Sequence, residues 1–76
     1  MNSLPETYTD FFIAYWPCEG GAQPLRLGRE QALAVWSSPA EVQNYGRFTG
    51  WVLQPVKVTR SALLDSAESL YFRPAV

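Results

Sequence analysis

The stretch that decides the fold reads YTDFFIAYW and runs from Tyr8 to Trp16. Aromatic and β-branched residues dominate it, and these residue types favour β-strands. Successive side chains of a strand point to opposite faces of the sheet. The two faces would carry Phe11, Ile13 and Tyr15 on one side, and Phe12, Ala14 and Trp16 on the other. Because both faces are apolar, we expect a strand that is buried on both sides or nearly so.

A hairpin is predicted directly after this strand. Pro17 should end the strand because proline lacks the N–H that strand pairing needs. The following Glu19-Gly20-Gly21 supplies the positive φ angles of a tight turn. The second strand, residues 22–27, is short and contains Pro24, so we expect it at the edge of a sheet.

Two short helices are expected in the middle of the chain. From Arg29 to Ser37 the spacing of the apolar residues is helical rather than alternating, which predicts the first helix. The apolar residues concerned are Ala32, Leu33, Val35 and Trp36.

The second helix has the clearest local signal, because Ser38-Pro39-Ala40-Glu41 matches a capping box. In such a box the serine oxygen accepts a backbone N–H three residues on, proline suits the first helical position, and glutamate reaches back. This helix would have barely two turns, with Val42 and Tyr45 facing the same way. Gly46 would end it in the left-handed conformation.

The C-terminal part predicts more strand. Residues 51–60 form a second convincing strand, and Gln54-Pro55 inside it implies an edge position or a bulge. Residues 61–67 favour one or two helical turns, and Leu70 to Arg73 favours a last strand before Pro74, although residues 61–73 stay ambiguous between helix and strand. The sequence thus predicts an α+β fold, in the order β-β-α-α-β-(α)-β: an antiparallel sheet of three to four strands with two short helices packed on one face.

Length and composition indicate one small domain. The 76 residues suffice for a single core over residues 1–76, with residues 1–7 as a flexible leader. Three Trp, four Tyr and four Phe are too many for a disordered chain. We expect the core to include Phe12, Ile13, Trp36 and Trp51.

A core of this size usually needs additional stabilisation. One cysteine and no histidine exclude an internal disulfide and the usual Cys/His zinc site. A homodimer is therefore a reasonable expectation, although Pro24 and Pro55 would blunt the edges of the sheet.

The composition also excludes most enzyme classes. Without histidine the chain lacks the commonest general base and metal ligand, and Cys18 has no base to activate it. The glycines do not match a phosphate-binding loop. We therefore expect a non-catalytic protein that holds no metal and no cofactor. No apolar run is long enough to span a membrane and no signal peptide is evident, so the expected location is the cytoplasm.

Binding to another protein is the leading functional hypothesis. Tyr, Trp and Arg are enriched at binding hot spots, and the candidate partner-binding residues are Tyr45, Arg47, Phe48 and Trp51, with Arg26 and Arg29. Such a protein could be an inhibitor or accessory factor, for example a phage or mobile-element protein that blocks a host protein by covering its surface. The same loop could instead be a helix cap whose aromatic rings fold inward while Arg47 is merely solvated.

Single-stranded nucleic-acid binding is the alternative function. Aromatic rings that alternate with arginines can stack on bases and meet phosphates. The net charge of −1 and the single lysine weigh against this alternative.

Overall fold

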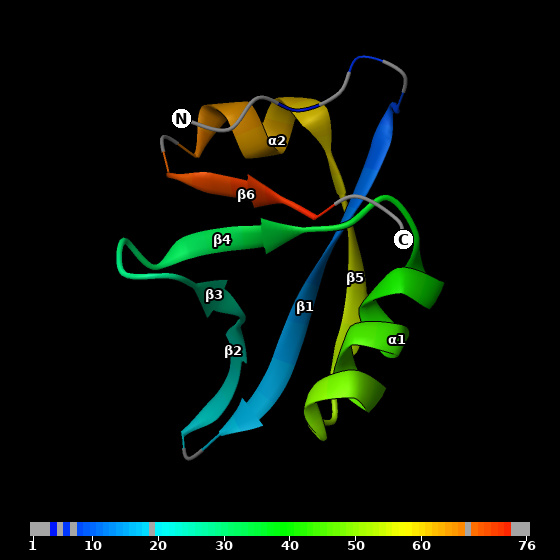
Figure 1. Cartoon of the computed structure of the whole chain (residues 1–76). Coiled ribbons are helices and arrows are strands. Elements are labelled where there is room, and N and C mark those ends of the chain that lie inside the picture. The colour runs from blue at the N-terminus through cyan, green and yellow to red at the C-terminus, as the bar shows by residue number, and fades with distance from the viewer. Residues whose placement is uncertain (1–3, 5, 7, 19, 67, 74–76) are drawn as a thin grey trace.

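The computed structural model describes residues 4, 6, 8–18, 20–66 and 68–73. These residues form two three-stranded sheets and two helices, which confirms the small α+β fold (Figure 1). In chain order the elements are β1 (Asp10–Cys18), β2 (Gly21–Pro24), β3 (Arg26–Leu27), β4 (Ala32–Val35), α1 (Pro39–Thr49), β5 (Gln54–Thr59), α2 (Arg60–Asp65) and β6 (Leu70–Phe72).

The first sheet has the order β2-β1-β5 and is antiparallel throughout. The predicted first strand and the hairpin after it are confirmed, with Glu19 of the turn outside the described residues. The single second strand predicted over residues 22–27 is wrong, because the strand is interrupted at Leu25 and its last part, β3, joins the second sheet. The prediction that Pro17 ends the strand is wrong, because β1 continues to Cys18. Alternate residues of a strand direct their polar backbone atoms to opposite edges, and the nitrogen of Pro17 faces the β5 side. Since β5 pairs only as far as Tyr15 there, Pro17 has no strand hydrogen bond to lose.

The two other prolines of this sheet lie at its outer edges. Phe12 directs its N–H and C=O to Trp36 and away from β5, so Phe11 and Ile13 are the residues that face β5. By the same alternation the nitrogens of Pro55 on β5 and Pro24 on β2 point outward. The expected edge positions of both prolines are confirmed, and each edge lacks a hydrogen-bond donor at the proline.

The second sheet has the order β3-β4-β6, and its β4–β6 pair is parallel. It is joined to the first sheet by two reciprocal hydrogen bonds of 2.8 Å, from the N–H of Phe12 to the C=O of Trp36 and from the N–H of Trp36 to the C=O of Phe12. The N–H of Leu25 adds a third bond of 2.8 Å to the C=O of Ala14. β1 therefore pairs with β2 through its last four residues. Through Phe12 it also pairs with Trp36, the residue directly after β4.

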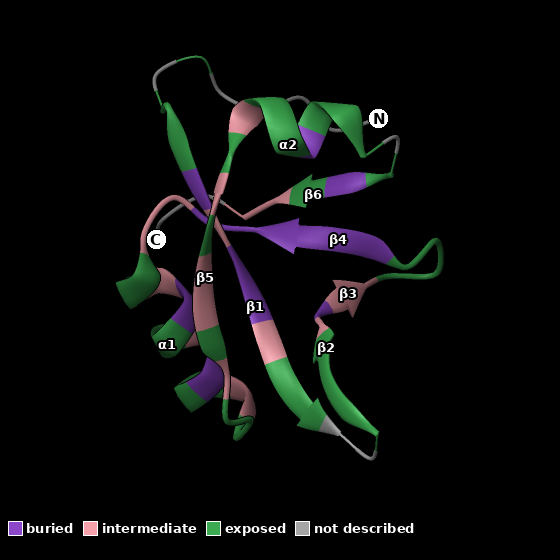
Figure 2. Cartoon of the chain, turned by 180° about the vertical axis from the view of Figure 1, so that it is seen from behind, coloured by how far each residue is buried: buried purple, intermediate pink, exposed green. Residues whose placement is uncertain are grey.

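The predicted helix over residues 29–37 is wrong. Residues 28–31 form a turn, with positive φ at Gly28 and Gln31, and the strand β4 follows. All four residues of β4 are buried (Figure 2). A strand covered on both faces has no polar alternation, so its short apolar run resembles a helix segment in sequence.

The serine cap predicted at the start of α1 is confirmed, with Pro39 in the first turn. The N–H of Glu41 donates to Ser38 Oγ over 3.3 Å, and Val42 and Tyr45 both pack into the interior. The predicted end at Gly46 is wrong, because α1 continues to Thr49 and Gly50 takes the left-handed conformation with φ 81°.

The C-terminal elements follow the predicted order. The strand predicted at residues 51–60 is β5, and the helical turns predicted at residues 61–67 are α2, whose first turn is capped by Thr59 Oγ1. The strand predicted after residue 70 is β6. Ala67 and Pro74 lie outside the described residues, as do residues 1–3, 5 and 7 of the predicted leader, while Leu4 packs in the core.

Two clusters form the core, one on each face of β1. The first contains Leu4, Phe11, Ile13, Leu33, Val35, Leu63 and Leu70, and the second contains Ala14, Leu25, Ala34, Trp36 and Val42. α2 contributes Leu63 to the first cluster and α1 contributes Val42 to the second, so the two helices are divided between the clusters rather than sharing one face. Ile13 and Trp36 are buried as predicted, and Phe12 is half-buried. Trp51, predicted in the core, is 40% exposed.

Trp36→Ala should destabilise the protein strongly. The Trp36 ring is 2% exposed and fills the second cluster, and truncating a buried tryptophan costs about 3–5 kcal/mol. Domains are stable by only about 0.05–0.15 kcal/mol per residue, so this loss is a large part of the total. Urea denaturation followed by circular dichroism measures the effect. Leu64→Ala, at a leucine 62% exposed on α2, is the control and should leave the midpoint nearly unchanged. Equal midpoints for the two variants would show that Trp36 does not hold the core.

Replacing both edge prolines should promote self-association. The Pro24→Val, Pro55→Val double variant regains an outward N–H on β2 and on β5, and unblocked edges pair readily. Sedimentation velocity at increasing concentration should show more dimer or larger species than the wild type. Pro39→Ala, in the first turn of α1, is the control and should behave as the wild type. A double variant that sediments as the wild type would refute the blocking role of these prolines.

Candidate functional site

A chain of aromatic rings connects the core to the surface near the end of α1. The rings of Trp36 and Tyr45 lie 5.5 Å apart between centroids, and those of Tyr45 and Trp51 lie 6.1 Å apart. Trp51 then meets Trp16 at 5.9 Å. Aromatic pairs at these separations attract one another beyond their burial. The buried Trp36 thus fixes the partly exposed Trp51 through Tyr45.

The loop between α1 and β5 is held by hydrogen bonds to the last turn of the helix. The N–H groups of Gly50 and Trp51 both donate to the carbonyl of Gly46, over 2.8 Å and 2.9 Å. Thr49 Oγ1 donates to the carbonyl of Tyr45 over 2.9 Å. These bonds satisfy carbonyls that a helix end otherwise leaves open, and they fix where the loop leaves the helix.

Gly46 lets this loop lie close to the helix. A Cβ atom at Gly46 would lie 2.8 Å from the carbonyl oxygen of Trp51 and 3.5 Å from Leu53 Cγ. The first distance is too short for a real Cβ contact, and its partner is a backbone atom that cannot swing away. Gly46 is therefore needed inside the helix for a tertiary contact, and Gly50 supplies the left-handed cap.

Large apolar side chains are exposed on this loop and beside it. Phe48 is 87% exposed and Val52 is 80% exposed, while Trp16 and Trp51 are each exposed by more than a third. We call the four side chains Trp16, Phe48, Trp51 and Val52 the apolar patch. They come from the end of β1, the last turn of α1 and the loop before β5, which lie at one end of the molecule (Figures 1 and 2).

Two arginines accompany the apolar patch. Arg47 is exposed, and its Nη2 donates to Asn44 Oδ1. The guanidinium carbon of Arg73 lies 4.5 Å from the centre of the Tyr45 ring and 5.5 Å from that of Tyr71. Within the described part of the chain, neither arginine forms an ion pair with a carboxylate.

The structure divides the six predicted partner-binding residues between two places. Tyr45, Arg47, Phe48 and Trp51 lie together at the end of α1, where Tyr45 is half-buried and supports Trp51. Arg26 and Arg29 lie at the β3–β4 hairpin, where Arg26 forms an ion pair with Glu68 and donates to the carbonyl of Gln31. Trp16 and Val52 were not among the predicted residues. The sequence did contain a signal for Trp16 as a surface residue, because this tryptophan stands at the end of the aromatic run, directly before Pro17.

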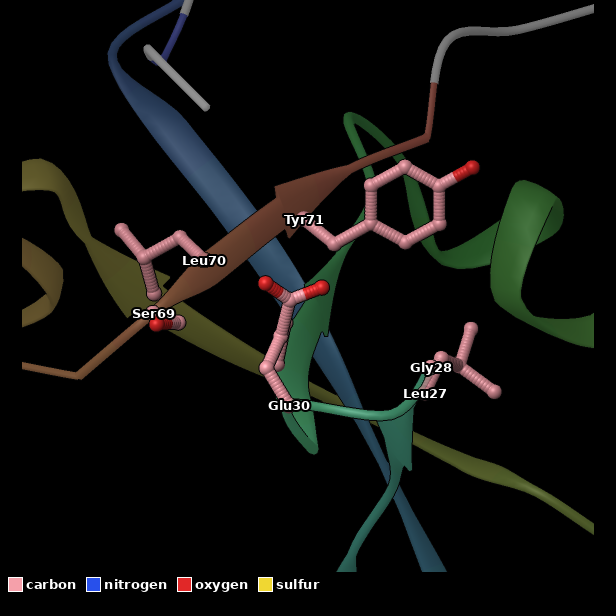
Figure 3. Close-up of a pocket in the computed structure, with 7 residues that line it drawn as sticks. Leu27, Gly28, Glu30, Ser69, Leu70 and Tyr71 are labelled. Atoms are coloured by element: carbon pink, nitrogen blue, oxygen red, sulfur yellow. The ribbon is translucent and has the colours of Figure 1, made fainter. Parts of the chain in front are cut away.

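A shallow depression of about 630 Å³ lies at the opposite side, between the β3–β4 turn and β6 (Figure 3). Its lining is Leu27, Gly28, Glu30, Ala32, Ser69, Leu70 and Tyr71. The Glu30 carboxylate and the hydroxyls of Ser69 and Tyr71 are its polar side-chain groups.

The described residues offer no metal centre, because none of them form a group of three or more Cys, Asp or Glu side chains. The side chain of Cys18 lies outside the described residues. Neither described helix is long and apolar enough to cross a membrane. No family model, curated protein or solved structure matches the chain. The function must therefore be inferred from the surface of this protein.

Gly46→Ala should loosen the loop although alanine favours helices. Alanine stabilises a helix by up to about 1 kcal/mol relative to glycine. Overpacking, however, destabilises a folded protein by about 1–3 kcal/mol. Because the added Cβ would lie only 2.8 Å from the Trp51 carbonyl oxygen, we expect the clash to be the larger effect. We expect a lower urea midpoint and a weaker near-ultraviolet circular dichroism signal from Trp16 and Trp51. Gln43→Ala, at an exposed position of the same helix, should change neither. An increase in stability for Gly46→Ala would mean that the close contact is absent.

Proposed function

We propose that this protein is a small non-catalytic protein-binding module that acts in the cytoplasm as an inhibitor or accessory factor. Its contact surface is the apolar patch, and its mechanism is to cover a functional surface of its partner. The observation that carries the proposal is the exposure of Phe48, in the last turn of α1, and of Val52, on the loop that is hydrogen-bonded to that turn.

The energetics of the patch favour a binding role. Burying a valine or phenylalanine side chain is worth about 1.5–3 kcal/mol, and Phe48 and Val52 gain little of it in this chain because both are mostly exposed. Aromatic side chains in the centre of an interface are the usual hot spots. Burial of these side chains by a partner would therefore stabilise the complex.

The rigid attachment of the loop adds to the case. Binding surfaces that are ordered before they meet their partner lose less conformational entropy on association. Trp51 lies between Trp16 and Tyr45, and its N–H is bonded to Gly46. The ring of Trp51 and the backbone of the loop are therefore held in place before a partner binds.

Single-stranded nucleic acid is less suited to this surface. Stacking on bases needs free ring faces next to several cations. The Tyr45 ring already contacts Trp36, Trp51 and Arg73, and within the described residues Arg47 is the only charged side chain in the sequence from 43 to 53. Nuclease treatment of the proteins captured from a lysate tests this alternative.

The test compares what Phe48→Asp and Leu64→Asp retain from a lysate of the natural host. Both variants place a charge at an exposed apolar side chain, one in the patch and one on α2. We expect a stoichiometric protein partner that survives nuclease treatment, is captured by wild type and Leu64→Asp, and is reduced about tenfold by Phe48→Asp, since a charge in an apolar contact must be desolvated. Quantitative mass spectrometry measures the captured partner.

Circular dichroism of both variants serves as the control for folding. If both variants are folded and Phe48→Asp captures the partner as well as the wild type, the apolar patch is not the contact surface. If every captured protein is lost after nuclease treatment, nucleic-acid binding replaces protein binding as the function.

A further inference from the structure

Among the described residues, the charged side chain closest in sequence to the exposed Phe48 is Arg47, and it forms no ion pair. Arg47 is one residue from Phe48, and its guanidinium bonds to the neutral side chain of Asn44. The nearest carboxylate on the same helix is Glu41, six residues earlier, which corresponds to about 9 Å along the axis. This separation is comparable to the screening length of about 8 Å at physiological salt. Glu41 therefore neutralises little of the Arg47 charge.

The helix end does not neutralise Arg47 either. The C-terminus of a helix carries only about half a negative charge. The carbonyl of Gly46, in the last turn, already accepts bonds from the N–H groups of Gly50 and Trp51. A full positive charge on Arg47 exceeds this partial charge, so the end of α1 attracts anions.

Arg73 is a second cation, and it is linked to the patch indirectly, through the Tyr45 ring. Its guanidinium lies over the Tyr45 ring, which in turn contacts Trp51. A guanidinium stacked on rings has few conformations to lose, and its N–H donors stay directed around the edge of the group. By contrast, the charged side chains Lys57 and Asp10 on the neighbouring strands pair with each other at 3.5 Å.

A second copy of this chain does not complement this surface. An isologous dimer would bring another Arg47 to the interface and, from the described patch, no carboxylate. A stable interface buries about 800 Å² on each partner, whereas the four patch side chains include two that are already more than half covered. The outward prolines also prevent the two edges of the first sheet from extending the contact.

We propose that the partner docks an acidic amphipathic segment on the apolar patch. This inference rests on the proposed function and names the chemistry of the partner. The apolar side chains of the segment cover Phe48, Trp51 and Val52, and a carboxylate beside them bonds to the guanidinium of Arg47. Carboxylate–guanidinium bonds of this kind are directional and stronger than neutral hydrogen bonds.

The probe for this proposal is a random linear peptide library displayed on phage and selected on the immobilised full chain. Selected peptides are synthesised, and their affinities are measured by fluorescence anisotropy for the wild type, Phe48→Asp, Arg47→Glu and Arg29→Glu. Arg29 is the matched control, because it is an exposed arginine in the turn before β4, away from the patch. Circular dichroism verifies that every variant is folded.

We expect the selected peptides to combine aromatic or aliphatic residues with Asp or Glu. Their affinity should fall about tenfold or more for Arg47→Glu, because like charges repel at a contact, and stay unchanged for Arg29→Glu. Replacing the peptide carboxylate by lysine should restore binding to Arg47→Glu.

Two results would contradict different parts of the argument. Peptides that require Phe48 but show no enrichment in Asp or Glu, or that bind Arg47→Glu as well as the wild type, would refute the acidic partner and leave the proposed surface intact. Peptides that bind Phe48→Asp as well as the wild type would refute the apolar patch itself.

Discussion

The pair of hydrogen bonds between Phe12 and Trp36 is the constraint on which the rest of the structure depends. Each residue donates its N–H to the carbonyl of the other over 2.8 Å, which fixes the end of β4 beside the middle of β1. Through this contact β1, the central strand of the first sheet, also lies against the second sheet. Each face of β1 contributes residues to one core cluster. A chain of 76 residues thereby buries one strand on both sides instead of forming one open sheet with a single covered face.

The same contact places the candidate site. Because the Trp36 backbone is fixed to β1, its ring sits at the centre of the second cluster and supports Tyr45 of α1. Tyr45 then positions Trp51, and Trp16 from β1 meets Trp51 from the other side. The positions of the exposed rings thus follow from a core residue, so the surface keeps its shape as long as the core is intact.

Local signals in the sequence were sufficient for the elements they describe. The aromatic run of β1, the capping box at Ser38 and the turn at Gly20 each act through neighbours in the chain. The features that were missed depend on distant contacts. Gly46, which was taken for a cap, is the exception, because the Trp51 carbonyl that approaches it is only five residues away. β4 resembled a helix because other parts of the chain cover both of its faces, which removes the polar alternation of a half-exposed strand. For the same reason no local pattern could reveal that Arg26 is engaged by Glu68.

The arrangement of the edges limits how this protein can bind. Proteins commonly recognise partners by adding a strand to a free edge, but this mode needs backbone donors along the edge. Pro24 and Pro55 remove an outward donor from each edge of the first sheet. The edge strands of the second sheet, β3 and β6, have only two and three residues. Binding through side chains meets no such obstacle, and four of the seven large exposed apolar side chains within the described residues come from the end of β1, the end of α1 and the loop that follows α1. The prolines at the sheet edges and the exposed rings at the end of α1 thus both favour the proposed docking through side chains over strand addition.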